Sequence, residues 1–292
     1  MSFSPAQAAD EEVHRLVLVI PDHAHVTRTI DIRIESVHDD RVRSAQSQNI
    51  YDDDVTKTAD GYAIHRHRIG TKLSPPQNTN YSSPEWVVWW SAVDDMTYTT
   101  DSDFISRDIE DWPEVQRHLF GSVDSAIAKS DPTARGQLAR LDAGDAASVL
   151  LEGENMMSSA RRYMLRVGYP LKGTTTSAAP GGGGTLSLTK TFSLTKWDTA
   201  SDDAEIDYDL GDDSGSLNAL MNRTLAQMNQ SHTKLSASWG NDLEMSQHCH
   251  FSAWISSGLI RHGECIEKTV WHHEGHLTSE TKTIAMSENL NK

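Results

Sequence analysis

The chain has 292 residues, of which 37% are hydrophobic, and its 42 acidic against 26 basic side chains give a net charge of −16 at pH 7. This excess of negative charge argues against nucleic acid and anionic membrane surfaces as partners, because both select basic patches. No stretch approaches the roughly 18 consecutive apolar residues of a membrane-spanning helix, so no transmembrane segment is predicted.

The first residues carry part of the pattern of an export signal. Ala6-Gln7-Ala8 has the small-x-small form of a signal-peptidase site, which would place the mature N-terminus near Ala9. The charged and apolar regions that normally precede such a site are missing. We therefore expect residues 1–12 to be the disordered stub of a trimmed signal, with a disordered cytoplasmic N-terminus as the alternative. Two cysteines, if paired, fit an oxidising compartment, so the expected location is periplasmic or secreted.

Residues 13–69 have the alternation of an antiparallel meander. Ile30, Ile32 and Ile34 share one face of a strand whose other face is polar, and a period of two suits a half-buried strand. The acidic run from Tyr51 to Gly61 is interpreted as a loop. The strands expected here are Val13–Ile20, Val26–Val37, Arg41–Ile50 and Tyr62–Ile69.

A helix is predicted to begin at Ser83-Pro84-Glu85, which supplies an N-cap hydroxyl, a proline in the first turn and then an acid. Trp86, Trp89 and Trp90 follow at helical spacing on one face. Such a stripe is more often the buried face of a helix. The same residues could also line a cavity for an apolar ligand, and they are the candidate ligand-binding residues.

Strands and then helices occupy the middle of the chain. Met96–Thr100 and Phe104–Ile109 are expected to form a hairpin, and a helix begins at Trp112. Asp145 is expected to cap a longer helix that reaches Met164. Tyr169–Gly184 ends in a Pro-Gly run and is interpreted as a flexible linker.

Most of the remaining chain again has the period of strands. In the strand from Asp242 to Ile255, Cys249 and Phe251 lie on the apolar face, and His248 and His250 lie on the other. The expected elements are strands at Thr185–Lys196, Ala204–Leu210 and Lys234–Trp239, a helix from Ser216, and three strands between Asp242 and Met286.

The last meander permits a prediction of its register. Ser256–Gly258 is a three-residue hairpin loop with glycine where φ must be positive. With that loop, Cys249 falls directly opposite Cys265, at a separation that suits a disulfide. Two small buried thiols are the alternative.

The order of strands, helices and strands predicts an α+β protein and not a doubly wound sheet. We expect two meanders to join in one large curved antiparallel sheet packed on a central group of helices. Residues 13–292 are expected to form a single domain, with a division at residues 170–184 as the alternative.

Histidines suggest a metal site in the last meander. In the predicted register His250 faces Glu264, and His262 lies beside them opposite Ser252. Together with His248, these side chains could hold Zn²⁺ or Cu²⁺. A solvated polar sheet face explains the same residues without metal, and no other cofactor is predicted.

Catalytic signatures are absent from the sequence, which contains no G-x-S-x-G, no phosphate-binding loop and no nucleophilic cysteine pattern. This favours a non-enzymatic protein. In His65-Arg66-His67-Arg68 the two arginines share one face and the two histidines share the other. The arginines could bind an anion, but pairing with acidic residues on neighbouring strands is the preferred interpretation.

The layout resembles a group of uncharacterised exported bacterial proteins, and its architecture is similar to that of envelope lipoprotein carriers, which wrap a curved antiparallel sheet around helices. The resemblance depends on Asp95–Trp112, with its Y-x-x-D-x-D hairpin, on the Tyr169–Gly184 linker and on the closing S-S-G-L-I hairpin. It covers about two thirds of the chain. These motifs are turns and caps, so no functional residue is carried over.

Three functions remain open from the sequence. The first is a periplasmic or secreted protein that binds an apolar small molecule or an envelope protein. The second is a metal-binding protein that uses the histidines of the last meander. The third is a structural or self-assembling envelope component, because residues 187–195 give one strand a Ser/Thr face. The sequence does not predict an oligomeric state.

Overall fold

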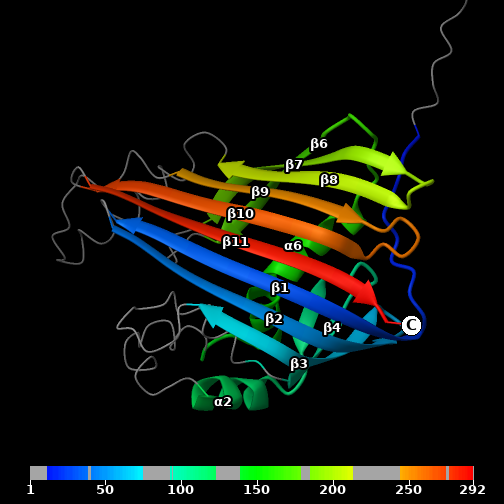
Figure 1. Cartoon of the computed structure of the whole chain (residues 1–292), viewed down its shortest axis with the longest axis horizontal. Helices are drawn as coiled ribbons and strands as arrows, with labels where there is room; N and C mark the ends of the chain where they lie inside the picture. The colour runs from blue at the N-terminus through cyan, green and yellow to red at the C-terminus, as the bar shows by residue number, and fades with distance from the viewer. Residues whose placement is uncertain are drawn as a thin grey trace, which may run out of the picture.

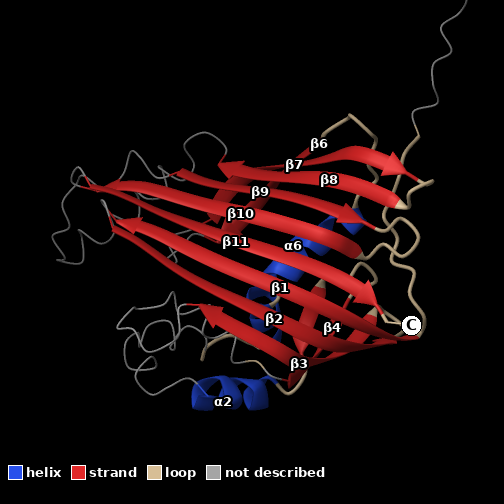
Figure 2. Ribbon diagram, in the orientation of Figure 1, coloured by secondary structure: helices blue, strands red, loops and turns tan. Residues whose placement is uncertain are grey.

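The computed structural model describes residues 12–38, 41–74, 93, 95–122, 139–178, 185–212, 244–273 and 276–291. In these residues, eleven strands form one antiparallel sheet in the order β5-β4-β3-β2-β1-β11-β10-β9-β8-β7-β6 (Figures 1 and 2). The strands are β1 His23–His38, β2 Arg41–Lys57, β3 Tyr62–Ser74, β4 Asp95–Thr100, β5 Ser106–Ile109, β6 Leu171–Ala178, β7 Thr185–Asp198, β8 Asp203–Asp212, β9 Glu244–Ala253, β10 Ile260–His273 and β11 His276–Leu290.

Two meanders meet at the centre of this sheet, as predicted. β1 pairs with β11 from Val26↔Leu290 to His38↔Thr278, so the first and last described strands are neighbours. β2 to β5 extend the sheet on one side of this pair, and β10 to β6 extend it on the other.

The α+β class and the central group of helices were wrong. Strands take 63% and helices 14% of the described residues. The helices there are short: α2 Trp112–Ser122, α5 Ala143–Leu150, α6 Glu152–Ser158 and the single 3-10 turn η1 Ser159–Arg162. α5 contacts β5, and α6 lies over β10 and β11 (Figure 2), so these helices do not form a layer on which the sheet is packed.

Two misread segments account for much of this error. The acidic run after Tyr51 continues β2 to Lys57, because its alternation buries Asp53 and Val55 and leaves Asp54 exposed. Leu171–Ala178, expected in a linker, forms β6 and pairs with β7.

The predicted helix that was to reach Met164 is also divided. It is replaced by α5, α6 and η1, and the side chain that caps α5 belongs to Asp142 and not to Asp145. The predicted helices from Ser83 and Ser216 and the strand at Lys234–Trp239 lie outside the described residues.

The predicted disulfide is confirmed. Cys249 and Cys265 are paired in register, are bonded, and have their Cα atoms 4.0 Å apart. The neighbouring pairs His250↔Glu264 and Ser252↔His262 also match the prediction. In the hairpin loop, Gly258 has φ +70°, which glycine adopts without strain.

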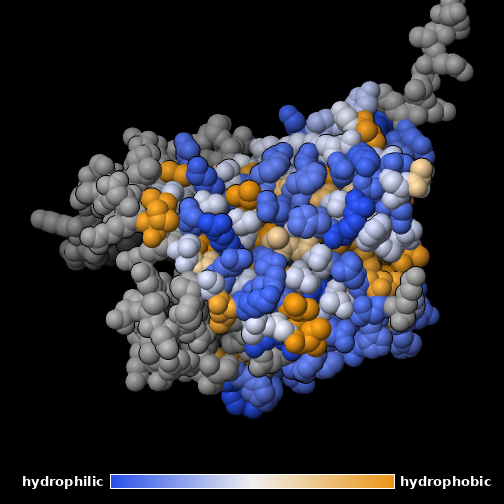
Figure 3. Space-filling view, viewed as in Figure 1, coloured by the Kyte–Doolittle hydropathy of each residue, from blue (hydrophilic) through white to orange (hydrophobic). Residues whose placement is uncertain are grey.

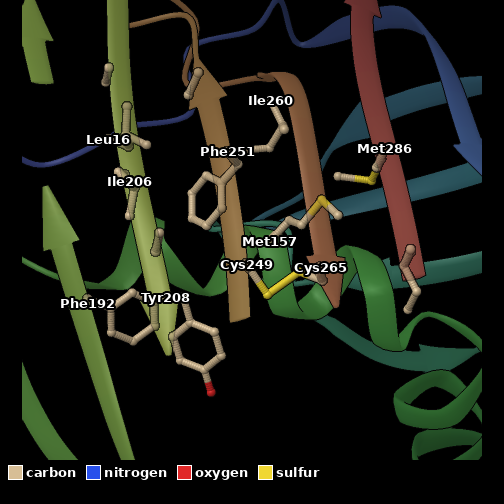
Figure 4. Packing of buried hydrophobic residues seen from close by; sticks show 14 of the residues in the cluster. Leu16, Met157, Phe192, Ile206, Tyr208, Cys249, Phe251, Ile260, Cys265 and Met286 are labelled. Atoms are coloured by element: carbon tan, nitrogen blue, oxygen red, sulfur yellow. A yellow bond between two sulfur atoms is a disulfide. The ribbon is translucent and has the colours of Figure 1, made fainter. Parts of the chain in front are cut away.

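Alternation along the strands places one face of the sheet, here called the inner face, against the helices. One apolar cluster there includes Ile64, Tyr98 and Leu119, and a second includes Phe192, Phe251 and the disulfide. Figure 4 shows Met157 of α6 beside Phe251 and the disulfide. The two clusters meet at the middle of the sheet, where the buried side chains are charged.

Candidate functional site: an inner-face pocket beside a buried charge network

Six charged side chains and one tyrosine lie buried at the centre of the inner face. These residues belong to β1, β2, β3 and β4 of the first meander, to α6 and η1, and to β11. The three groups of elements are far apart in the sequence. We call this set the central charge network: Arg28, Asp53, Arg66, Tyr98, Glu154, Arg161 and Glu288. Its three guanidinium groups balance three carboxylates, and each charged residue is at most 7% exposed.

Arg66 of β3 joins the first meander to α6. Its Nε and Nη2 donate to the two oxygens of Asp53, each at 2.9 Å, which is the bidentate geometry that suits a guanidinium and a carboxylate. Its Nη1 donates to Glu154 Oε1 at 2.5 Å, and its Nη2 also donates to Tyr98 Oη at 3.0 Å. The guanidinium lies over the ring of Tyr51, 4.5 Å from the centroid. The strand pairing that was preferred for this arginine is therefore present.

Arg28 of β1 and Arg161 of η1 share Glu288 of β11. Arg28 Nη2 donates to Glu288 Oε1 at 2.8 Å, and Arg161 Nη2 donates to Glu288 Oε2 at 3.0 Å. The amide of Ile260 donates to the same Oε2 at 2.8 Å. Arg28 also pairs with Asp53, so the hydrogen bonds continue from one meander to the other through β1 and β11.

The electrostatics keep these groups ionised. Burial alone raises the pKa of Asp53, but the guanidinium groups of Arg66 and Arg28 outweigh it and hold this pKa below its usual range. Burial likewise raises the pKa of Glu288, and Arg28 and Arg161 reverse the direction. Burial raises the pKa of Tyr51 to about 12, so its hydroxyl remains neutral at physiological pH.

A pocket opens on the inner face beside this network. Arg66 and Glu154 form its charged wall, and β1, β2, β4, α5 and Val93, which precedes β4, supply the rest. The lining residues are Ile30, Ile32, Asn49, Tyr51, Arg66, Val93, Met96, Leu150 and Glu154. The space between them is about 350 Å³, a figure that includes the open solvent at the mouth.

The candidate ligand residues Trp86, Trp89 and Trp90 lie outside the described residues, so their role stays a prediction. The pocket itself was not predicted from the sequence. Ile30 and Ile32 were recognised as one apolar face, but the sequence does not indicate that part of this face is left uncovered by other apolar side chains.

The proposed metal ligands lie on the opposite, outer face of the sheet. His248 Nδ1 lies 2.7 Å from Asp209 Oδ1, and His250 Nδ1 lies 2.7 Å from Asp207 Oδ1. His262 and Glu264 are exposed on the adjacent strand β10. Within the described ranges, no group of three or more His, Cys, Asp or Glu side chains converges closely enough to hold a metal ion. Metal binding by these four residues stays a prediction without a preformed site.

No helix among the described residues is both long enough and apolar enough to cross a membrane.

Comparisons with known proteins identify no family. No protein-family model and no curated protein sequence matches the chain. Among solved structures, it aligns with one that concerns lipid–protein interactions in lipovitellin, over 92% of this chain and 25% of that one, at 10% identity and a TM-score of 0.46. The chain thus spans a quarter of the lipovitellin chain.

Two Pseudomonas aeruginosa proteins align with lower scores. OccK11 is matched over 96% of this chain and 99% of that chain, with 7% identity and a TM-score of 0.22. OccK5 is matched over 94% of this chain and 99% of that chain, with 9% identity and a TM-score of 0.23. Likenesses at this level assign this chain neither a family nor a ligand.

Proposed function

We propose that the protein is a non-enzymatic binding protein that holds a small, mainly apolar and uncharged ligand in the inner-face pocket. The observation that carries this proposal is the composition of the pocket wall. Five of its nine lining side chains are apolar and four are polar or charged, so a ligand would meet apolar surface beside groups that can orient it. The apolar members are Ile30, Ile32, Val93, Met96 and Leu150.

The charge balance of the wall favours an uncharged ligand. Arg66 is already paired with Asp53 and Glu154, so neither an anion nor a cation would meet an uncompensated partner. An ionised ligand group would lose its hydration in this buried region without a matching gain.

Polar groups at the edge can orient a ligand that carries a hydroxyl or carbonyl group. Tyr51 keeps its proton, and Asn49 has its Oδ1 occupied by the hydroxyl of Thr71 at 2.9 Å.

The ligand can be sought directly. Native mass spectrometry of the protein purified from its own host is expected to show an added small-molecule mass that denaturation releases. For affinity, the neutral probe N-phenyl-1-naphthylamine is titrated into the delipidated protein and is expected to bind saturably, with enhanced fluorescence.

Two variants with the same substitution separate the pocket from the rest of the core. Leu150→Trp fills the pocket and is expected to weaken probe binding at least about tenfold, because the ligand volume is lost. Leu188→Trp overpacks an equally buried position on β7 that does not line the pocket, and it should bind the probe as wild type does. Equal binding by the two variants, or no saturable binding by wild type, would refute the proposal.

We further propose that the protein is periplasmic or secreted. The confirmed disulfide is consistent with an extracellular or periplasmic protein, because such bonds persist in oxidising compartments.

A further inference from the structure

The sheet ends in two edge strands that differ in how their outer backbone groups are covered. β5 and β6 are the first and last strands of the sheet order. Any edge strand presents a row of backbone N–H and C=O groups that another strand can pair with, so proteins usually cover or interrupt such edges. The two edges of this sheet can therefore be compared for the features that prevent pairing.

β5 is protected in three ways. It has only four residues, Ser106–Ile109, and its pairing with β4 is interrupted by a register shift between Thr99 and Thr100. α5 packs against it. The amide of Ser106 donates to Asn155 Oδ1 of α6 at 2.8 Å. A short, irregular and covered strand gives an incoming strand little to pair with.

β6 has none of these protections within the described part of the chain. It has eight residues, Leu171–Ala178, and all of them pair with β7 in one unbroken register. β7 is its only hydrogen-bonded neighbour among the described strands (Figure 1). The strand contains no proline, Lys172 is its only charged residue, and the side chains of Thr174 and Thr176 are exposed. A straight edge of this length is a template for a further strand.

This edge also lies in a part of the chain that lacks acidic residues. No Asp or Glu occurs between Glu154 and Asp198, although the whole chain carries a net charge of −16. Acidic side chains return on the outer face at Asp207 and Asp209 of β8. β8 is two strands in from the edge, or about 10 Å. A second acidic molecule therefore meets less repulsion at β6 than over the rest of the sheet.

The outer face of the sheet is a poorer site for a second molecule. Figure 3 shows this face covered mostly by hydrophilic residues, and the Asp–His pairs of β8 and β9 lie on it. Stacking two such faces would bring the acidic residues of both chains together and would remove water from charged groups without giving them new partners. Pairing at the edge of β6 avoids both costs, because it joins backbone groups flanked mainly by Ser and Thr side chains.

We propose that β6 pairs antiparallel with β6 of a second copy of the chain, so that two sheets continue as one. Copies related by a two-fold axis present the same strand to each other, and the numbers of paired residues then have a constant sum. Directly opposed residues lie on the same face of a sheet, so this sum is even. Two registers meet this condition and leave only one residue of β6 unpaired: one is centred on Thr174 and the other on Thr175.

The side chains of β6 are compatible with either register. Lys172 lies opposite Thr176 or Ala178, so the two lysines are about 14–20 Å apart along the strands. The acidic side chains on β8 of the two copies are five strand spacings apart, about 24 Å, which is well beyond the Debye length of about 8 Å at physiological salt. A foreign strand would form the same backbone bonds, but β6 itself matches this edge in length, face and charge.

Sedimentation velocity of the full chain over a concentration series tests the pairing. The wild type is expected to pass from monomer to dimer as its concentration rises. Dimers should form more readily at high salt than at low salt, because salt screens the repulsion between two acidic chains. In either register, Thr174→Lys/Thr176→Lys places each new lysine opposite another lysine. This variant should dimerise at least about tenfold more weakly than wild type.

The matched control adds the same charge inside the sheet. Ser44→Lys/Thr56→Lys changes two exposed residues of β2, a strand that lies between β1 and β3. This control should dimerise as wild type does, and circular dichroism should show both variants folded. A wild type that stays monomeric at every concentration, or equal weakening by the two variants, overturns the proposal.

A cross-link reports the geometry of the dimer without weakening it. The chain has two cysteines, and both are in the disulfide, so an introduced cysteine supplies the free thiol. In either register the two copies of Thr174 are directly opposite or diagonal neighbours, within about 8 Å. A short bifunctional maleimide should therefore join Thr174→Cys into a covalent dimer and leave Thr56→Cys monomeric. If dimers form in solution and Thr174→Cys is not cross-linked, the interface lies elsewhere and the proposal is wrong.

Discussion

Glu288 is a buried carboxylate that accepts hydrogen bonds from three separate elements, β1, η1 and β10. It accepts hydrogen bonds from Arg28 at 2.8 Å, Arg161 at 3.0 Å and the amide of Ile260 at 2.8 Å, and it is fully buried. Glu288→Gln keeps the size of the side chain but leaves three buried guanidinium groups facing two carboxylates. Removing one partner of a buried ion pair costs about 3–5 kcal/mol, and we expect that loss in the free energy of unfolding.

A second substitution tests whether charge balance is the cause. Arg161→Met removes the excess cation that Glu288→Gln creates, so the double variant should lose about 1–3 kcal/mol less than the sum of the two single variants. The exposed pair of Arg33 and Glu35, which lies 3.0 Å apart on the outer face, is the control, and Arg33→Met/Glu35→Gln should change stability by less than about 1 kcal/mol.

Urea unfolding followed by circular dichroism measures these values, and its pH dependence supplies a further check. The folded pKa of Glu288 lies below its ordinary value, so its contribution is fully present above the unfolded pKa of about 4.3 and is lost as pH falls through the lower folded value. The Gln variant should therefore lose stability less steeply below about pH 4. Additive single variants, or a cost for Glu288→Gln below about 1 kcal/mol, would contradict the charge-balance reasoning.

Three further predictions concern local features of the fold. Replacing both Cys249 and Cys265 by alanine should lower stability by about 3 kcal/mol, and reductant should bring wild type to the same unfolding midpoint, because the bond closes a loop with a sequence separation of 16. Gly258→Ala should cost more than about 2 kcal/mol in urea unfolding, since its Cβ would lie 2.4 Å from a carbonyl oxygen, whereas Gly168→Ala has open space and should cost only about 1 kcal/mol for its positive φ. Asp142→Ala should cost about 1 kcal/mol through loss of the N-cap bond of 2.8 Å, and a near-zero change would show that α5 is held by packing alone.

Local alternation determined which face each strand presents and how the last hairpin pairs. Side chains two residues apart point the same way, so Ile30, Ile32 and Ile34 were placed on a buried face without knowledge of the rest of the chain. The predicted pairing of Cys249 with Cys265 is correct, but the loop ending at Gly258 does not produce it alone. Ile260 pairs with Ala253, and a bulge before His262 shifts the register by the one residue that brings the two cysteines opposite each other.

Only the tertiary structure explains why the buried charged residues are stable. Asp53 was interpreted as part of a loop because an isolated acidic run has no reason to enter a core, and its pairing with Arg28 and Arg66 makes its burial tolerable. Arg28 and Glu288 are separated by 260 residues, and they meet because β1 and β11 are neighbours. A repeating pattern records whether a side chain points inward, but whether a charge there is stable depends on partners that only the strand order brings within reach.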